Sequence, residues 1–227
     1  DILFDEKVLK KGASIVKKVN KEVASIIGIN AAARTTCVKP SGNASVLLQT
    51  ASGIHAEHSP MYIRNVQMNK ESEITQAISR TNPFMVEDSV WSAGGTDVVV
   101  SFPIVPKTGS LFKDNLYGVK HLELVKKAQK AWVVAGTNED LCADKGLHHN
   151  VSNTIIVDDW DEVEKYVFEN RRSFAGISFL GMTGDKDYNQ APNTAVITAK
   201  DMVKKYGNAA VFASGMVIDA LKCFNNL

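Results

Sequence analysis

The stretch "TTCVKPSGNASVLLQT", Thr35 to Thr50, places a β-branched run and an apolar run on either side of a turn made of small residues. The first run is typical of a short strand, and the second indicates a helix. Between them lie residue types that cap helix N-termini or let the backbone approach a ligand closely, namely Ser41, Gly42, Asn43 and Ser45. The order strand, turn, helix predicts either an ordinary capped connection or a seat for an anion.

The anion interpretation rests on the physics of a helix start. Free N–H groups and the helix dipole attract phosphate there, and ligands of parallel α/β folds bind beyond the C-terminal ends of strands. Lys39 would add positive charge. The stretch lacks the Gly-x-x-x-x-Gly-Lys-Ser spacing of nucleoside-triphosphate loops and the Gly-x-Gly-x-x-Gly of dinucleotide loops. Chemistry alone therefore leaves open both a plain connector and a phosphate site of unassigned family.

The composition is that of an ordinary globular protein. Of 227 residues, 44% are hydrophobic and 22% charged, and the net charge of +1 provides no basic field for nucleic acid. No apolar run is long enough for a membrane span, and no signal peptide is visible. Three widely spaced cysteines argue against a disulfide framework or a structural zinc site. We therefore expect a cytoplasmic protein with neither membrane nor nucleic-acid partners.

Hydrophobic periodicity predicts alternating helices and strands along the chain. The long helices are expected at about Phe4 to Ile27, Gly118 to Gly136 and residues 161–173, with shorter ones at 71–80, 199–207 and 208–224. Strands are expected at 35–39, 61–68, 97–105, 150–157 and 176–182, the third and last of them buried. Strands separated by helices of this length indicate parallel β-α units. We expect residues 1–227 to form one α/β domain.

Five segments in register resemble the adenosylcobalamin-dependent (class II) ribonucleotide reductases. The opening stretch resembles their Thr-Cys-Val-Lys-Pro-Ser-Gly segment. The other four are "SGIHAEHSPMYIRNV", "HNVSNTIIV", "GISFLGMTGDKDYNQAP" and "AVFASGMVIDALKCFNNL". The match runs from about Ala31 to Leu227.

The resemblance implies a fold and a function. It implies that the chain is the C-terminal half of a ten-stranded α/β barrel made of two five-stranded halves. The whole enzyme would replace the ribose 2′-OH of a ribonucleotide by hydrogen, through a thiyl radical that adenosylcobalamin generates. An external thiol reductant would complete the cycle. The substrate phosphates would bind at the turn formed by Pro40, Ser41, Gly42, Asn43, Ala44 and Ser45.

Several family features differ or are missing. Asn43 stands where the family usually has Thr, Asn65 replaces the second Arg of a pair that begins with Arg64, and Gly181 replaces a frequent Pro. The radical-bearing Asn-Pro-Cys-x-Glu motif is absent, since Phe84 follows the only Asn-Pro. No catalytic residue is therefore assigned, and this piece alone is expected to be inactive. Cys37 is expected to be a packed strand thiol, and Cys142 and Cys223 ordinary thiols.

Histidines offer further candidate sites. The sequence "HAEH", His55 to His58, suggests either a metal cluster or a polar loop, and we assign no metal. The resemblance implies that His55 lies near the cobalamin or the substrate. Of His148 and His149, we expect one packed and one solvated. The remaining polar candidates are Ser152 and Asn153, as satisfied core groups or barrel-lining groups, and Asp185 and Asp187, as a solvated turn.

Other functions remain open on the sequence. The chain begins without Met and stops inside an apolar periodic pattern, which indicates a fragment. The alternatives are a stand-alone nucleotide- or phosphate-binding module without catalysis, and one chain of a split reductase. An isolated half-barrel would expose sheet edges and apolar surface. We therefore expect the remaining half of the barrel, in cis or as a separate chain, to be a partner.

Overall fold

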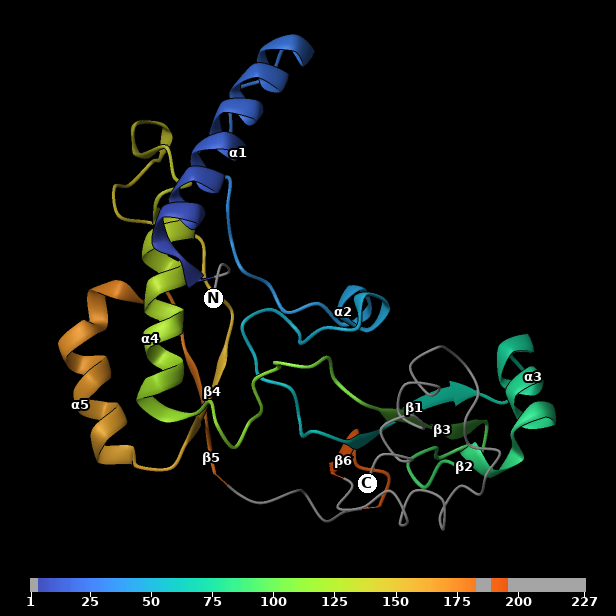
Figure 1. The fold of residues 1–227 in the computed structure, drawn as a ribbon. Coiled ribbons are helices and arrows are strands. Elements are labelled where there is room, and N and C mark those ends of the chain that lie inside the picture. Colours follow the sequence, from blue (N-terminus) through green and yellow to red (C-terminus); the bar gives the residue numbers. More distant parts are fainter. Residues whose placement is uncertain (1–3, 183–188, 196–227) are drawn as a thin grey trace. The chain divides into compact units, whose positions relative to one another are not determined.

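The structure is a computed structural model that describes residues 4–182 and 189–195. These residues fall into two compact units (Figure 1). The first contains the residues up to Ala56 together with Lys113–Met182, and the second contains Glu57–Phe112 together with residues 189–195. The helices predicted for 199–207 and 208–224 and the turn with Asp185 and Asp187 lie outside the described residues.

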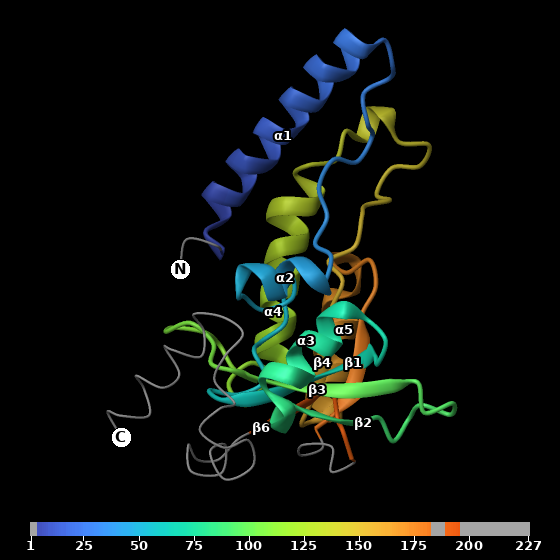
Figure 2. The same ribbon diagram turned by 90° about the vertical axis from the view of Figure 1, so that its right-hand side faces the viewer.

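The long N-terminal helix of the first unit is confirmed as α1, Glu6–Ile27. Asp5 caps its start by accepting hydrogen bonds from the N–H groups of Lys7 and Val8 at 2.8 and 3.2 Å. Gly28 ends it in the left-handed conformation, at φ 73°. Both views show α1 beside α4 (Figure 1 and Figure 2). The outer apolar face of α1 stays largely exposed: Val8, Ile15, Val19, Val23, Ile26 and Ile27.

The core of the first unit forms around α4, Gly118–Ala128. The helix expected there is confirmed, but its last part, η3 (Gln129–Val134), is a π-helix. The core side chains come from α4, η3 and the elements that follow: Leu122, Val125, Ala128, Val133, Val151, Ile155, Val157 and Val163. Of these, Leu122, Val125 and Ala128 follow the helical period on one face of α4, which is why the sequence revealed this helix.

A parallel β-α-β unit covers this core. Strand β4, Thr154–Val157, pairs in parallel with β5, Ser178–Gly181. Helix α5, Trp160–Asn170, connects them and is capped by Asp159, which accepts from two N–H groups. The parallel arrangement predicted from the sequence is confirmed here.

The strand predicted for residues 176–182 forms as β5, but the prediction that it is buried is wrong. Phe179 and Leu180 in β5 are 39% and 42% exposed. The reason is that β5 pairs only with β4 among the described strands and so lies at an edge. An apolar run marks a strand without showing whether a second element covers it.

The second unit is built on a four-stranded antiparallel sheet in the order β2-β3-β1-β6. The bounds are Tyr62–Asn69 for β1, Val86–Asp88 for β2, Asp97–Ile104 for β3 and Asn193–Ala195 for β6. Helix α3, Glu73–Thr81, and the short 3-10 helix η2, Pro83–Met85, follow β1.

The expectation of parallel units is wrong for this sheet. Strands β1 and β3 were both predicted, and a helix does lie between them. However, the chain reverses through the short strand β2, which pairs antiparallel with β3. Three residues, Val-Glu-Asp, are too few to show an alternating pattern, so this reversal is not visible in the sequence.

The strand predicted for residues 35–39 does not form. Only single bridges occur there, Arg34 with Thr137 and Val38 with Val151. The Thr36 hydroxyl donates to the carbonyl of Trp132 at 2.6 Å. The first part of the segment therefore bonds to the π-helix and the residues after it, and Val38 bonds to residues 150 and 152, without a continuous ladder along either. The strand expected from residue 150 is correspondingly shorter and begins at Thr154.

The close approach of this segment to η3 leads to a stability prediction. A Cβ added at Gly136 would overlap the Thr36 side chain, with its Cβ only 2.8 Å away. We expect Gly136→Ala to lower the free energy of unfolding by about 2–3 kcal/mol, because overpacking strains a filled site. Chemical denaturation measures this. Gly94→Ala, at an exposed glycine whose added Cβ meets only Thr96 Cγ2 at 3.6 Å, is the control. Equal stability of the two variants would contradict the prediction.

Candidate functional site

The turn singled out in the sequence leads into a short helix, α2, which runs over Asn43–Leu48 as predicted. The turn is held by a reciprocal pair of bonds. The N–H of Ser45 donates to Ser41 Oγ at 3.0 Å, and the Ser45 hydroxyl donates to the Ser41 carbonyl at 2.6 Å. Both polar groups of the buried Ser45 are therefore used inside the turn.

The outer side of the turn presents the remaining donors. The first N–H groups of a helix have no acceptor within the helix, and here that leaves the backbone of Gly42, Asn43 and Ala44 for other acceptors. Pro40, Gly42 and Ala44 are exposed and Ser41 is half-buried. A Cβ added at Gly42 meets nothing within 4 Å, so space lies open above this backbone. The arrangement fits an anion, and Ser45 shapes the turn from the inside.

A second loop supports the turn from below. The hydroxyl of Ser52 donates to the Ser41 carbonyl at 3.0 Å. Gly53 has φ 62°, and a Cβ built on it lies 3.2 Å from the Lys39 carbonyl and 3.3 Å from Pro40 Cα. The loop therefore contacts the turn through one hydrogen bond and through direct backbone packing.

His55, which the resemblance places near the cofactor or substrate, bonds to backbone at both ring nitrogens. Its Nδ1 lies 2.9 Å from the Ser52 carbonyl, and its Nε2 accepts from the N–H of Thr154 at 3.0 Å. This is the polar-loop interpretation of "HAEH" rather than the metal one. Among the described residues, no group of three or more His, Cys, Asp or Glu side chains is placed to hold a metal ion.

His121 is a site residue that the sequence analysis missed. It lies on α4 and is buried, and its Nε2 is 2.9 Å from the Ile54 carbonyl. Burial, the largest effect, lowers the pKa of His121. Its ring stands edge-on to that of His55, with centroids 6.2 Å apart. Its place on the apolar face of α4, next to Leu122, was the only signal in the sequence.

The cysteine prediction needs correction. Cys37 is exposed rather than packed, because the segment that carries it is no strand and turns its side chain outward. Its carbonyl accepts from the Trp132 ring N–H at 3.0 Å. Cys142 is half-buried with its Sγ 3.5 Å from the Asn138 carbonyl. Cys223 lies outside the described residues.

The polar residues near the start of β4 are mostly structural. His148 is half-buried against the Thr137 hydroxyl, at 3.2 Å, while His149 is exposed, which confirms the expectation of one packed and one solvated histidine. Asn153 is buried, and its amide donates to the Val151 carbonyl at 2.6 Å. Its Oδ1 has no hydrogen-bond partner among the described residues. Ser152 is half-buried, and its N–H donates to the Val38 carbonyl.

The second unit holds a separate polar cluster. The Tyr62 hydroxyl donates to the buried Glu57 carboxylate at 3.1 Å, and Arg64 donates to the same hydroxyl oxygen at 3.1 Å. Burial, and next the Glu57 charge, raise the pKa of Tyr62 to about 12, while Arg64 acts in the opposite sense. Arg64, the residue that matches the family's arginine, thus contacts a neutral phenol.

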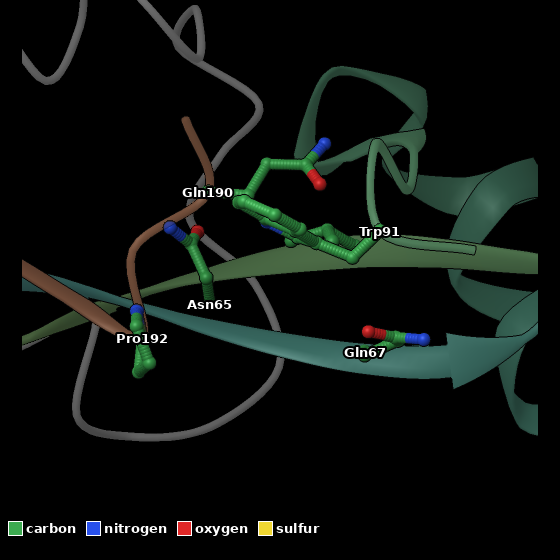
Figure 3. A pocket seen from close by; sticks show the side chains of 6 residues that line it. Asn65, Gln67, Trp91, Gln190 and Pro192 are labelled. Carbon is green, nitrogen blue, oxygen red and sulfur yellow. The ribbon is translucent and has the colours of Figure 1, made fainter. Parts of the chain in front are cut away.

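A pocket of about 390 Å³ lies over the sheet of the second unit. It is lined by Asn65, Gln67, Trp91, Val99, Gln190 and Pro192. Figure 3 shows the ring of Trp91 beside Gln190, with Asn65 nearby. Gln190, at φ 59°, bonds to Asp88 and Glu87 on one side and to Val90 on the other. Asn65 similarly bonds to the Ala191 carbonyl and the Ser101 hydroxyl. These amides hold the wall of the pocket together.

The described residues define a mixed α/β protein with a two-stranded parallel sheet and a four-stranded antiparallel sheet. A crystal structure of a B12-dependent (class II) ribonucleotide reductase superposes with a TM-score of 0.70 over 96% of this chain and 28% of that chain, at 18% identity. A probable adenosylcobalamin-dependent ribonucleoside-triphosphate reductase of Dictyostelium discoideum is 26% identical over 121 residues, 53% of this chain and 16% of that protein. No family model matches the chain.

These comparisons confirm the resemblance inferred from the sequence. The chain is similar in sequence and fold to adenosylcobalamin-dependent ribonucleotide reductases, and it spans less than a third of the length of either relative. The mixed α/β architecture is confirmed. The described strands form one four-stranded and one two-stranded sheet, which are not a complete ten-stranded barrel. Within the part of the chain that the structure describes, no helix is long and apolar enough to cross a membrane.

The raised pKa of Tyr62 gives a prediction for alkaline pH. Because the folded state holds the phenol proton more tightly than the unfolded state, the resulting stabilisation is complete below pH 10 and is lost as pH rises toward about 12. We expect the free energy of unfolding to fall more steeply over this range in the wild type than in Tyr62→Phe. Denaturant titrations at several pH values measure the slopes. Glu57→Gln, which removes one cause of the shift, should give an intermediate slope, and parallel curves for all three proteins would refute the assignment.

Proposed function

We propose that this chain is part of the catalytic barrel of an adenosylcobalamin-dependent ribonucleotide reductase and that it supplies the seat for the substrate phosphates. The observation that carries the proposal is the turn Pro40–Ser45. Its inner bonds use the Ser45 hydroxyl and N–H, and a Cβ added at Gly42 would meet nothing within 4 Å. Backbone N–H groups at a helix start, together with the helix dipole, bind phosphate oxygens. The similarity over 96% of the chain to a class II reductase supports the same function.

In the proposed enzyme, residues 1–227 work as one domain inside the larger barrel. The turn would orient a ribonucleoside di- or triphosphate through Ser41, Gly42, Asn43 and Ala44, while Pro40 and Ser45 fix the shape of the turn. Adenosylcobalamin would supply the radical chemistry. The chain's own contribution is binding, because its sequence lacks the radical-bearing cysteine motif. A cytoplasmic location follows from the cysteine pattern.

Both ring nitrogens of His55 bond to backbone groups, so neither is available as a cobalt ligand in this arrangement. A place of His55 beside the cofactor stays a prediction. No chemical step is derived through the cofactor from this chain.

The partner that we propose is the remaining part of the barrel, on the same chain or on a separate one. Apolar side chains are exposed on helices α1 and α2 of the first unit. Ile26 is 81% exposed and Leu47 is 83% exposed. Apolar surface of this kind marks an interaction site. An external thiol reductant would restore the reactive cysteines that the partner carries.

A charge placed in the turn tests the phosphate seat. We expect Gly42→Asp to weaken binding of a ribonucleoside triphosphate by about tenfold or more, because a carboxylate would occupy the space for the anion. The fold should persist, since Asp is a favourable residue at a helix N-cap. Isothermal titration calorimetry with the triphosphate measures the affinity. Gly94→Asp, at an exposed glycine of the second unit, is the matched control.

Three results separate the alternatives. Loss of triphosphate binding in Gly42→Asp alone supports the seat. Equal binding by wild type and Gly42→Asp would refute it. In the third result the wild type binds the triphosphate, but no ribonucleotide is reduced when the remaining part of a class II reductase and adenosylcobalamin are supplied. That result would favour a stand-alone binding module over an enzyme part.

A further inference from the structure

The two hydrogen bonds of the His55 ring assign one nitrogen as an acceptor and the other as a donor. Its Nε2 receives the N–H of Thr154, so this nitrogen carries no proton. Its Nδ1 must then hold the ring proton and donate it to the Ser52 carbonyl, 2.9 Å away. The ring therefore links the first residue of β4 to the loop that follows α2. Because both ring nitrogens form hydrogen bonds to backbone groups, the His55 side chain fixes the positions of two backbone segments.

The loop held by His55 is the one that touches the turn Pro40–Ser45. The Ser52 hydroxyl donates to the Ser41 carbonyl at 3.0 Å. Gly53 packs on Lys39 and Pro40, with a positive φ that disfavours any other residue. The position of the turn therefore depends on the position of the loop through two independent contacts.

A second imidazole holds the same loop. His121 of α4 donates from Nε2 to the Ile54 carbonyl at 2.9 Å. It is only 2% exposed, and burial lowers its pKa, so it stays neutral. Two carbonyls of the loop, those of Ser52 and Ile54, are therefore held by the rings of His55 and His121, of which the first also bonds to β4 and the second belongs to α4.

The anchored loop sets the orientation of Ser41. The Ser41 carbonyl accepts two hydroxyls, from Ser45 and from Ser52. Its own hydroxyl accepts the N–H of Ser45, which leaves its proton free to be donated. If Ser52 withdrew, one of the bonds that keep the Ser41 carbonyl turned inward would be lost.

We propose that His55 is a positioning residue for the Pro40–Ser45 turn, acting through Ser52. The identity of the anion rests on the proposed function, but the bracing of the turn does not. His55 would accordingly affect phosphate affinity without touching the ligand, which is a different role from that of a neighbour of the cofactor.

The experiment compares five forms of the full chain with the wild type. They are His55→Ala, His55→Asn, Ser52→Ala, the double variant His55→Ala/Ser52→Ala, and His149→Ala as an exposed-histidine control. One readout is amide hydrogen exchange over residues 42–48. The other is the affinity for a ribonucleoside triphosphate by calorimetry, and adenosylcobalamin affinity is measured alongside.

We expect His55→Ala and Ser52→Ala each to raise exchange in residues 42–48 and to weaken triphosphate binding by about five- to tenfold, the effect of one hydrogen bond. The double variant should be little worse than either single one, because both act on the same path. His55→Asn keeps a donor near the Nδ1 position and should recover part of the affinity. His149→Ala should match the wild type.

Other outcomes overturn the inference. Unchanged exchange in residues 42–48, or losses that add in the double variant, would remove the path through Ser52. A changed adenosylcobalamin affinity with an undisturbed turn would assign His55 to the cofactor instead. If His55→Ala fails to fold, Ser52→Ala decides, since it leaves both bonds of His55 in place. The wild type could bind no triphosphate while His55→Ala still raises exchange in residues 42–48. That result would contradict the proposed function but would support the positioning of the turn by His55.

Discussion

The position of the turn depends on the end of the π-helix. In a π-helix the backbone closes wider turns, and such turns recur at functional sites. The carbonyl of Trp132, near the end of η3, accepts the Thr36 hydroxyl at 2.6 Å, and the Gly136 carbonyl accepts both the N–H and the hydroxyl of Thr35. The absence of a side chain at Gly136 makes this approach possible. The segment that leads into Pro40 is thereby fixed to the core before the turn begins.

The parts of the fold that one-sided burial produces are visible in the sequence. The apolar face of α4 packs against β4 and α5, so its period shows in the sequence. The parts that tertiary pairing decides are not visible. Residues 35–39 look like a strand, but their polar groups bond to a helix end. The antiparallel sheet depends on the three-residue strand β2, which has no pattern to recognise.

The candidate site was predictable to a similar extent. The turn could be predicted because it contains small residue types that favour helix starts, and this preference depends only on neighbouring residues in the sequence. The second hydrogen bond to the Ser41 carbonyl was not readable from the sequence, because its donor is the Ser52 hydroxyl, eleven residues away. His121 was hidden for the same reason. A histidine inside an amphipathic helix shows no sign of the carbonyl, sixty-seven residues earlier in the chain, that it will bind.

A phosphate seat made of backbone donors works only while those donors stay unpaired within the protein. In this unit the inner acceptor, the Ser41 carbonyl, is satisfied by two hydroxyls rather than by amides of the turn. Only one backbone N–H, that of Ser45, bonds to the Ser41 side chain. Hydroxyl groups suit the bonds within the turn because they rotate toward their acceptor, whereas backbone N–H groups keep the direction that the helix gives them. The rings of His55 and His121 bond to carbonyls of the neighbouring loop, those of Ser52 and Ile54, and use none of the N–H groups of the turn. A ring in place of a carboxylate adds no negative charge beside the helix start, where an anion is attracted.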